Sequence, residues 1–223
     1  MKRFAVYYAP RPGTFAARAN EWLGWDPAAG QALPQPQVPG IADPAAITAD
    51  PCRYGFHGTI RAPFRLAEGV SSDTAAATVA TLAARLAPVA CEGLILENLH
   101  GFLALTPEGC EAALLELGVA VVEATNDLRA PLSEAEIARR RPEALSPRQR
   151  ELLHRWGYPY VMEEFRFHLT LTDRLADPAP AMAALEAHFA DALPRPFVIE
   201  DLCLYGEDAA GRFHLLHRYA LTG

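Results

Sequence analysis

Two short segments of this sequence share a pattern of residue types that is suited to acid–base chemistry. The first is YGFHGTI, residues 54–60, and the second is FRFHLTLT, residues 165–172. Each places a histidine two residues before a threonine, and an apolar residue follows the threonine. His57 with Thr59 and His168 with Thr170 therefore form a matched pair of motifs.

Histidine can act as base or acid near neutral pH, because its ordinary pKa is about 6.5. Cleavage of a phosphodiester uses both forms: a base activates the attacking oxygen and an acid protonates the leaving oxygen. Two nearby imidazoles repel a second proton, which favours the singly protonated pair. Threonine hydroxyls can donate to the non-bridging phosphate oxygens. We therefore interpret His57 and His168 as catalytic candidates and Thr59 and Thr170 as substrate-binding candidates.

Two arginines and a tyrosine near the motifs are further candidates. Side chains two residues apart in a strand share a face, so Arg61 is expected beside the first motif and Arg166 beside the second, where each can bind a developing anion. Tyr160, like Tyr158, precedes the second motif strand and can either contact a base or phosphate or serve in packing. No acidic side chain is expected on the strand face that carries the histidine in either motif. We therefore predict neither a metal site nor a cofactor.

Composition narrows the class of partner. The chain has 223 residues, is 51% hydrophobic and carries a formal net charge of −7. A sizeable core in one large domain or two small lobes is possible, and a general nucleic-acid binder is disfavoured. Residues 129–155 contain seven arginines and four glutamates. That segment can contact a phosphate-bearing ligand through residues 139–141, or it can be a solvated helix face.

Cysteine spacing and hydropathy predict the cellular compartment of the protein. The four cysteines, at 52, 91, 110 and 203, include no CxxC pair. They indicate neither zinc nor a disulfide framework, and we expect small buried thiols in a reducing compartment. No run approaches eighteen apolar residues, so no membrane partner is expected and a cytoplasmic location is predicted.

The order of predicted elements indicates an internal repeat. A motif strand, a helix and two further strands follow one another in residues 53–105 and again in 164–221, with the motif strands expected at about 53–61 and 164–172. Helices are expected at 14–23, 72–86, 106–126 and 179–192, the third with Thr106 as its cap and Pro107 in its first turn. The capping-box patterns SEAE and SPRQ predict two short helices in the arginine-rich segment. The proline-rich segment 26–52 predicts a loop or flap. We predict a single bilobed α+β domain over 1–223, with two small, mostly antiparallel sheets facing a central cleft and helices outside.

The paired motifs resemble those of the 2H (two-histidine) phosphoesterase superfamily, which includes RNA 2′,3′-cyclic phosphodiesterases. The segments RYGFHGTIRAPFRL, RAPLSEAEIARRRPEALSPRQRELLHRWGYPYVMEEFRFHLTLT and FHLLHRYAL are similar to a family linked to phosphonate metabolism within it. Gly58 stands where alanine is expected in that family, and Arg61 where lysine is common. The resemblance implies that His57 and His168 are the catalytic pair and that Thr59 and Thr170 bind phosphate.

We therefore expect a metal-independent hydrolase that acts on a cyclic phosphodiester, either a 2′,3′-cyclic nucleotide or RNA end or a ribose cyclic phosphate. Its expected partner is a small phosphorylated or cyclic-phosphate substrate, with a short RNA end as a second candidate. Two alternatives stay open. One is a binding module that holds a phosphorylated metabolite or RNA end without turnover. The other is ligation of RNA ends, against which the acidic body of the protein counts.

Overall fold

Seven strands pair into one sheet, and every pairing along it is antiparallel. The computed structural model describes residues 1–223. The strand order is β11-β10-β1-β4-β8-β7-β6. The strands are β1 (Phe4–Tyr8), β4 (Gly58–Phe64), β6 (Gly93–Leu99), β7 (Phe102–Glu108), β8 (Leu169–Thr170), β10 (Asp201–Glu207) and β11 (Phe213–Ala220). With helices on the outside, this confirms the α+β class.

The sheet has two halves that meet at the motif strands. One register pair, Gly58 with Leu169, joins β4 to β8. Strands β1, β10 and β11 extend the sheet beyond β4, and β7 and β6 extend it beyond β8. The two sheets expected from the sequence are thus joined into one at this pair. Two short ladders lie apart: β5 (Val89–Cys91) with β9 (Phe197–Ile199), and β2 (Trp25–Asp26) with β3 (Gln31–Ala32).

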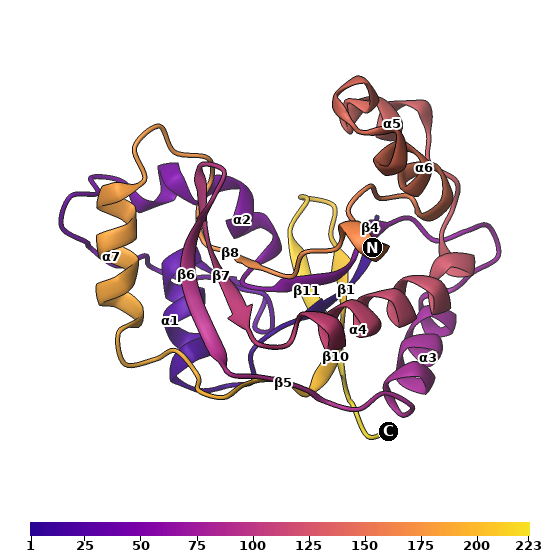
Figure 1. The fold of residues 1–223 in the computed structure, drawn as a ribbon, viewed down its shortest axis with the longest axis horizontal. Helices are drawn as coiled ribbons and strands as arrows, with labels where there is room; N and C mark the ends of the chain where they lie inside the picture. The colour runs from indigo at the N-terminus through magenta and orange to yellow at the C-terminus, as the bar shows by residue number, and fades with distance from the viewer.

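Helices flank the sheet in pairs (Figure 1). They are α1 (Thr14–Leu23), α2 (Ala49–Tyr54), α3 (Ser72–Ala83), α4 (Glu111–Ala124), α5 (Glu134–Arg139), α6 (Pro147–Trp156) and α7 (Ala179–Phe189). Helix α1 packs near α7 and α3 near α4, while α5 and α6 protrude together at one end. The indole nitrogen of Trp22 in α1 donates to the carbonyl oxygen of Leu171 at 2.8 Å, which ties this helix to the second motif segment. None of the helices has the length and apolar composition needed to cross a bilayer.

The two capping boxes predicted in the arginine-rich segment are confirmed. The hydroxyl of Ser133 accepts the backbone N–H of Glu136 at the start of α5. Ser146 does the same for Gln149 at the start of α6. Six of the seven arginines therefore lie on two defined helices and the short connection between them, and Arg129 precedes α5. In the proline-rich segment, no long element forms, as expected: it contains β3, a 3-10 turn (Pro44–Ile47) and the start of α2.

Both motif strands are shorter than the sequence predicts. The expected strand 53–61 is helical through Tyr54, and β4 begins only at Gly58. Of the expected strand 164–172, only Leu169 and Thr170 form a ladder. Each histidine is consequently the residue immediately before the first residue of its strand.

The helix expected from Thr106 begins five residues later, at Glu111. Thr106 and Pro107 instead continue β7, where Pro107 lies opposite Leu94 in the β6–β7 hairpin. The hydroxyl of Thr106 donates to Glu97 across that hairpin at 2.5 Å, so it does not cap a helix. Cross-strand pairing therefore overrides the local cap pattern here.

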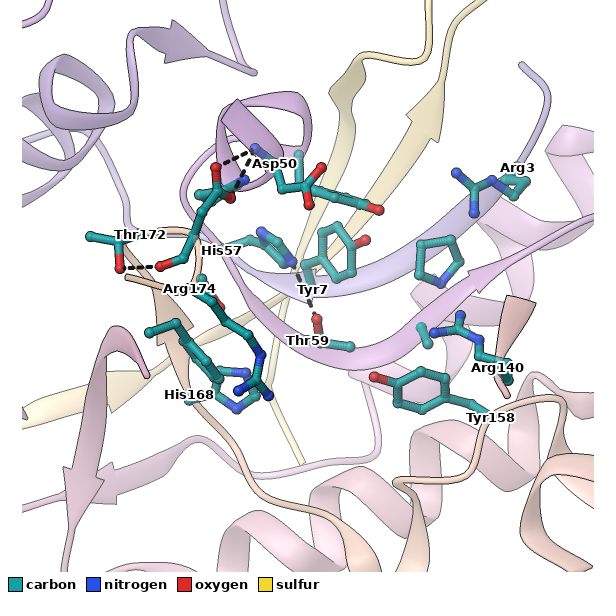
Figure 2. A pocket seen from close by; sticks show the side chains of 17 residues that line it. Arg3, Tyr7, Asp50, His57, Thr59, Arg140, Tyr158, His168, Thr172 and Arg174 are labelled. Atoms are coloured by element: carbon teal, nitrogen blue, oxygen red, sulfur yellow. Dashed lines mark hydrogen bonds between the residues drawn. The ribbon is translucent and has the colours of Figure 1, made fainter. Parts of the chain in front are cut away.

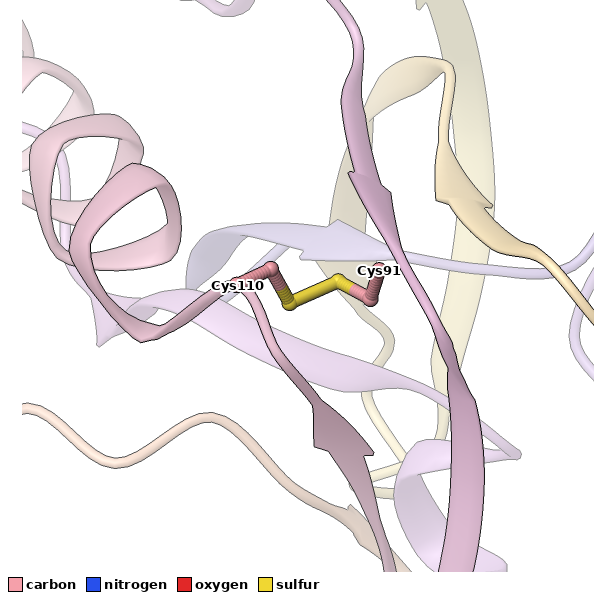
Figure 3. The surroundings of a disulfide bond; sticks show 2 residues. All are labelled: Cys91 and Cys110. Carbon is pink, nitrogen blue, oxygen red and sulfur yellow. A yellow bond between two sulfur atoms is a disulfide. The ribbon is translucent and has the colours of Figure 1, made fainter.

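Two of the four cysteines are disulfide-bonded, so the expectation of four free thiols is wrong. Cys91 and Cys110 form the bond, and Cys52 and Cys203 are free (Figure 3). The hairpin explains the pairing, because Gly93 faces Glu108 and the same register continued by two residues places Cys91 opposite Cys110. The bond joins β5 to the residue that precedes α4 and so closes the open end of the β6–β7 hairpin.

Removal of this disulfide should lower the free energy of unfolding by about 3 kcal/mol, as expected for a closed loop of this length. The test compares urea unfolding of the Cys91→Ala/Cys110→Ala double variant with that of Cys52→Ala, which removes a free thiol. Protein purified without reductant should also show two titratable thiols in denaturant. Four thiols, or equal stability of the two variants, would contradict the pairing.

Candidate active site

A cavity of about 500 Å³ lies over the junction of β4 and β8. Both motifs line it: His57 and Thr59 from the first, and His168 and Thr170 from the second (Figure 2). The volume lies within the range of pockets that hold a small-molecule ligand. Thus the structure brings together the four polar residues of the two motifs, which are separated by about one hundred positions in the chain.

The two histidines are held by equivalent hydrogen bonds. Nδ1 of His57 lies 2.9 Å from the carbonyl oxygen of Gly55, and Nδ1 of His168 lies 2.9 Å from that of Arg166. A carbonyl only accepts, so Nδ1 carries the proton in both rings. When the ring is neutral, Nε2 has a free lone pair. The Thr59 hydroxyl donates to Nε2 of His57 at 3.2 Å.

Gly58 allows the two motif strands to approach each other. A β-carbon at this position would lie 2.2 Å from Cζ of Phe167, a distance that no packed side chain can accept. The Phe167 ring therefore occupies the space above Gly58, and this explains why glycine stands where alanine was expected. Gly58 follows His57 and Phe167 precedes His168, so the contact fixes the backbone beside both histidines.

Aromatic rings surround the imidazoles. The ring of Tyr7 lies 3.9 Å from that of His57, and the rings of Tyr54 and His57 are 5.7 Å apart. Phe102 lies 5.7 Å from His168. Tyr7 reaches the site because it faces Thr59 in the β1–β4 register. These rings limit the access of water to the histidines.

Burial lowers the pKa of both histidines. Desolvation is the main cause for His57 and, with the charge of His168, lowers its pKa to about 4, although the Gly55 carbonyl favours the charged form. Desolvation also lowers the pKa of His168, against a smaller opposing effect of the Arg166 carbonyl. The free protein therefore holds His57 as a neutral imidazole at pH 7.

Arg61 does not lie in the cavity, and the expectation that it shares a face with His57 is wrong. The β1–β4 register shifts twice, once on each side of Val6, so strict alternation along β4 fails. Arg61 is buried with 1% of its surface exposed, and its Nη1 donates to the carbonyl oxygen of Trp156 at 2.9 Å. Its Nε and Nη2 have no partner, and desolvation lowers its pKa to about 9.

Arg166 and Tyr160 also lie outside the cavity lining. The segment before β8 is not a strand, so the two-residue alternation does not extend back to Arg166. Its guanidinium instead donates to the carbonyl oxygens of Glu163 and Phe165. Tyr160 is 45% exposed, and its neighbour Tyr158 lines the cavity in its place.

Three arginines that the motif analysis did not place in the site line the cavity: Arg3, Arg140 and Arg174. Arg3 precedes β1 and Arg174 follows the second motif, so neither belongs to a local pattern that could have identified it. Arg140 ends α5 and had been weighed as a ligand contact within the arginine-rich segment. Asp173 also lines the cavity, but its carboxylate accepts the backbone N–H groups of Ala49 and Asp50 at the start of α2.

No three His, Cys, Asp or Glu side chains are grouped at metal-binding spacing in the structure. The polar groups that line the cavity are instead imidazoles, hydroxyls and guanidinium groups, together with the carboxylates of Asp50 and Asp173. Such a set can accept and donate protons and can bind an anion.

The lowered pKa of His57 predicts that the protein loses stability as the pH falls. The unfolded chain binds a proton near pH 6.5 and the folded chain near pH 4, so this stabilisation is complete above pH 6.5 and is lost between those values. Between pH 7 and 4.5 the loss from this residue is roughly 2 kcal/mol. Urea titrations at the two pH values measure the loss. The free energy of unfolding of His57→Asn should fall by correspondingly less than that of the wild type, whereas that of His217→Asn, which replaces an exposed histidine, should fall as in the wild type. An equal loss in His57→Asn would contradict this account.

The comparisons with known proteins include one family model and two curated relatives. The family described as "Protein of unknown function (DUF1045)" matches residues 59–214. A protein named "Ribose 1,5-bisphosphate phosphokinase PhnN" from Janthinobacterium sp. (strain Marseille) is 38% identical over 220 residues, and one of the same name from Laribacter hongkongensis (strain HLHK9) is 41% identical over 214. The matches cover 95% and 94% of this chain but 49% of each relative, so the chain spans about half the length of these relatives.

Solved structures resemble the chain at a lower level. TT0787 of Thermus thermophilus has a TM-score of 0.48 and 15% identity over 99% of this chain and 98% of its own. E. coli LigT complexed with 3′-AMP has a TM-score of 0.45 and 17% identity, and the match covers 100% of this chain and 99% of LigT. At these scores nothing about the site follows from the likeness. The family match covers more than two thirds of the sequence, and the chain therefore belongs to the DUF1045 family.

Proposed function

We propose that this protein is a metal-independent phosphodiesterase that hydrolyses a cyclic phosphodiester, with His57 and His168 as its base and acid. One observation carries the proposal: each imidazole has its Nδ1 bound to a backbone carbonyl and lines the same cavity. Hydrogen bonds of this kind fix both the ring orientation and the tautomer, so that Nε2 is the nitrogen left for proton transfer.

The difference in pKa favours His57 as the base and His168 as the acid. Burial and the charge of His168 lower the pKa of His57 to about 4, while the smaller lowering at His168 lets this ring take the proton first. An anionic substrate bound between them would favour the protonated form of His168 further. Two titratable groups whose environments separate their pKa values form the usual arrangement of an acid–base pair.

In the proposed reaction, Nε2 of His57 takes a proton from a water molecule as the water oxygen attacks phosphorus. The ring P–O bond breaks on the opposite side, and Nε2 of His168 gives its proton to the departing oxygen. The product is a phosphomonoester with a free hydroxyl, and proton exchange with water restores both rings. Thr170 can donate to a non-bridging oxygen, and the Thr59 hydroxyl can do so once the attacking water takes its place at Nε2 of His57. The guanidinium role expected of Arg61 or Arg166 falls to Arg174, which lines the same cavity. One of its nitrogens donates to the carbonyl oxygen of His100, and it forms no salt bridge.

We propose as substrate a nucleoside or RNA-end 2′,3′-cyclic phosphate, or a ribose cyclic phosphate. A cavity of about 500 Å³ accommodates a group larger than a bare phosphate, and the tyrosine rings beside His57 offer a surface for a sugar or base. The net charge of −7 disfavours long RNA. The names of the curated relatives refer to a ribose phosphate, which supports a place in phosphonate metabolism together with the resemblance noted in the sequence.

The kinase activity in those names is not part of the proposal. P-loop kinases hold the phosphates with a Gly-rich loop that contains a lysine, in the pattern G-x-x-x-x-G-K-[ST]. Lys2 is the only lysine in this sequence, and Arg3 follows it where the pattern requires serine or threonine. This chain cannot form such a loop.

We also propose that residues 53–105 and 164–221 are duplicated units. Their motif strands, β4 and β8, pair with each other, and so do the strands that follow their helices, β5 and β9. Pairing between elements at equivalent places in the two segments is the pattern that an approximate twofold axis would produce. This supports a single site to which each unit contributes one motif.

Replacement of either histidine should abolish hydrolysis. His57→Ala and His168→Ala should each reduce kcat on 2′,3′-cyclic AMP by roughly 10²- to 10⁴-fold, the contribution of a positioned acid or base. The assay contains EDTA, and exposed His217→Ala in β11 serves as the matched control. Full activity in either motif variant would refute the acid–base assignment. Tight binding of cyclic phosphates by the wild type without any product would instead identify a binding module.

A further inference from the structure

The cavity continues, on one side, into a smaller groove of about 220 Å³. Arg3, Tyr54, Pro63 and Arg140 line both hollows, so the two are contiguous. Figure 2 shows Arg3 and Arg140 at one end of the site, with His57 and His168 at the other. The groove therefore opens from the end that the acid–base chemistry does not use.

The groove is rich in arginine although the protein as a whole is acidic, and two of its arginines, Arg3 and Arg53, are paired with Glu207 and Asp50. Four guanidinium groups line it, those of Arg3, Arg53, Arg139 and Arg140, against the single carboxylate of Glu136. Glu136 is itself bound to Arg65 at 3.0 Å, and this ion pair is the main cause that lowers the pKa of Glu136 to about 2. The charge of Glu136 is thus already matched by an arginine outside the groove.

Two of these guanidinium groups lack a counter-ion, those of Arg139 and Arg140. Of the two, only Arg140 also lines the cavity that holds the histidines. It is partly buried, forms no salt bridge and lies over the ring of Tyr158 with 4.7 Å between the guanidinium carbon and the ring centre. Arg3, across the same hollow, is held in place by two hydrogen bonds to Glu207 at 2.6 and 2.8 Å. A guanidinium group without a counter-ion, facing another that is held in place, can share a bound anion with it through charge-assisted hydrogen bonds.

We propose that the Arg3–Arg140 end of the cavity is a second anion subsite, which binds a terminal phosphate that the substrate carries in addition to the scissile cyclic diester. The substrate class becomes a phosphorylated sugar or nucleoside cyclic phosphate, with the second phosphate as a monoester. Arginine suits this role, because its planar group makes paired hydrogen bonds to phosphate oxygens. This inference rests on the proposed function for the identity of the other end of the ligand.

Two probes that differ in one group test the subsite: adenosine 2′,3′-cyclic phosphate, and the same compound with a 5′-phosphate. The wild type should prefer the 5′-phosphorylated probe in kcat/KM. In Arg140→Met, which keeps a long apolar stem, this preference should fall by roughly ten- to a hundredfold, as expected when charge-assisted hydrogen bonds are lost. Arg155→Met is the matched control, because Arg155 is an exposed arginine of the same segment outside both hollows.

Equal preference in the wild type and Arg140→Met would overturn the subsite, and so would a wild type that does not distinguish the probes. An adenosine dinucleotide that ends in the cyclic phosphate extends the test. If its internal diester gave the same gain as the 5′-phosphate, the proposed monoester would be wrong. If neither probe is hydrolysed, the proposed function fails. Dissociation constants of the same two probes then test the subsite separately. The subsite stands only if the 5′-phosphate tightens binding to the wild type and does not tighten binding to Arg140→Met.

Discussion

The contact between Gly58 and the ring of Phe167 is the constraint on which the site depends. Only one backbone pair joins the two halves of the sheet, and the ring occupies the space that any side chain at position 58 would need. His57 and His168 are the chain neighbours of these two residues. The same steric requirement that joins the halves therefore sets the imidazoles over one cavity, where the carbonyls of Gly55 and Arg166 fix their orientation.

Charge is arranged around this junction in two zones. Near the histidines, burial disfavours positive charge and leaves His57 as a neutral imidazole. Farther along, guanidinium groups gather at the end formed by the start of β1 and the end of α5. An overall acidic protein thus carries local groups of arginines along one cavity, an arrangement consistent with the small, doubly charged ligand proposed above.

The sequence was most informative where local chemistry determines structure. Both capping boxes and the pairing of the two motifs followed from residue types and spacing. Prediction failed where long-range pairing intervened: bulges in β4 turned Arg61 away, and the β6–β7 register continued β7 through Thr106. That register also places Cys91 opposite Cys110, so a hairpin aligned residue by residue would have revealed the disulfide. Arg3 lies far from either motif in sequence, and only the β1–β4 pairing brings it to the cavity.

A crystal structure of the protein soaked with orthovanadate, an analogue of the phosphoryl group in transfer, tests the central claim most directly. We expect one anion between the motifs, with Nε2 of His57 and Nε2 of His168 both within hydrogen-bonding distance of its oxygens and the Nδ1 bonds unchanged. An anion that contacts only one of the two rings, or binds elsewhere in the protein, would contradict the claim that the paired histidines act on a single phosphorus.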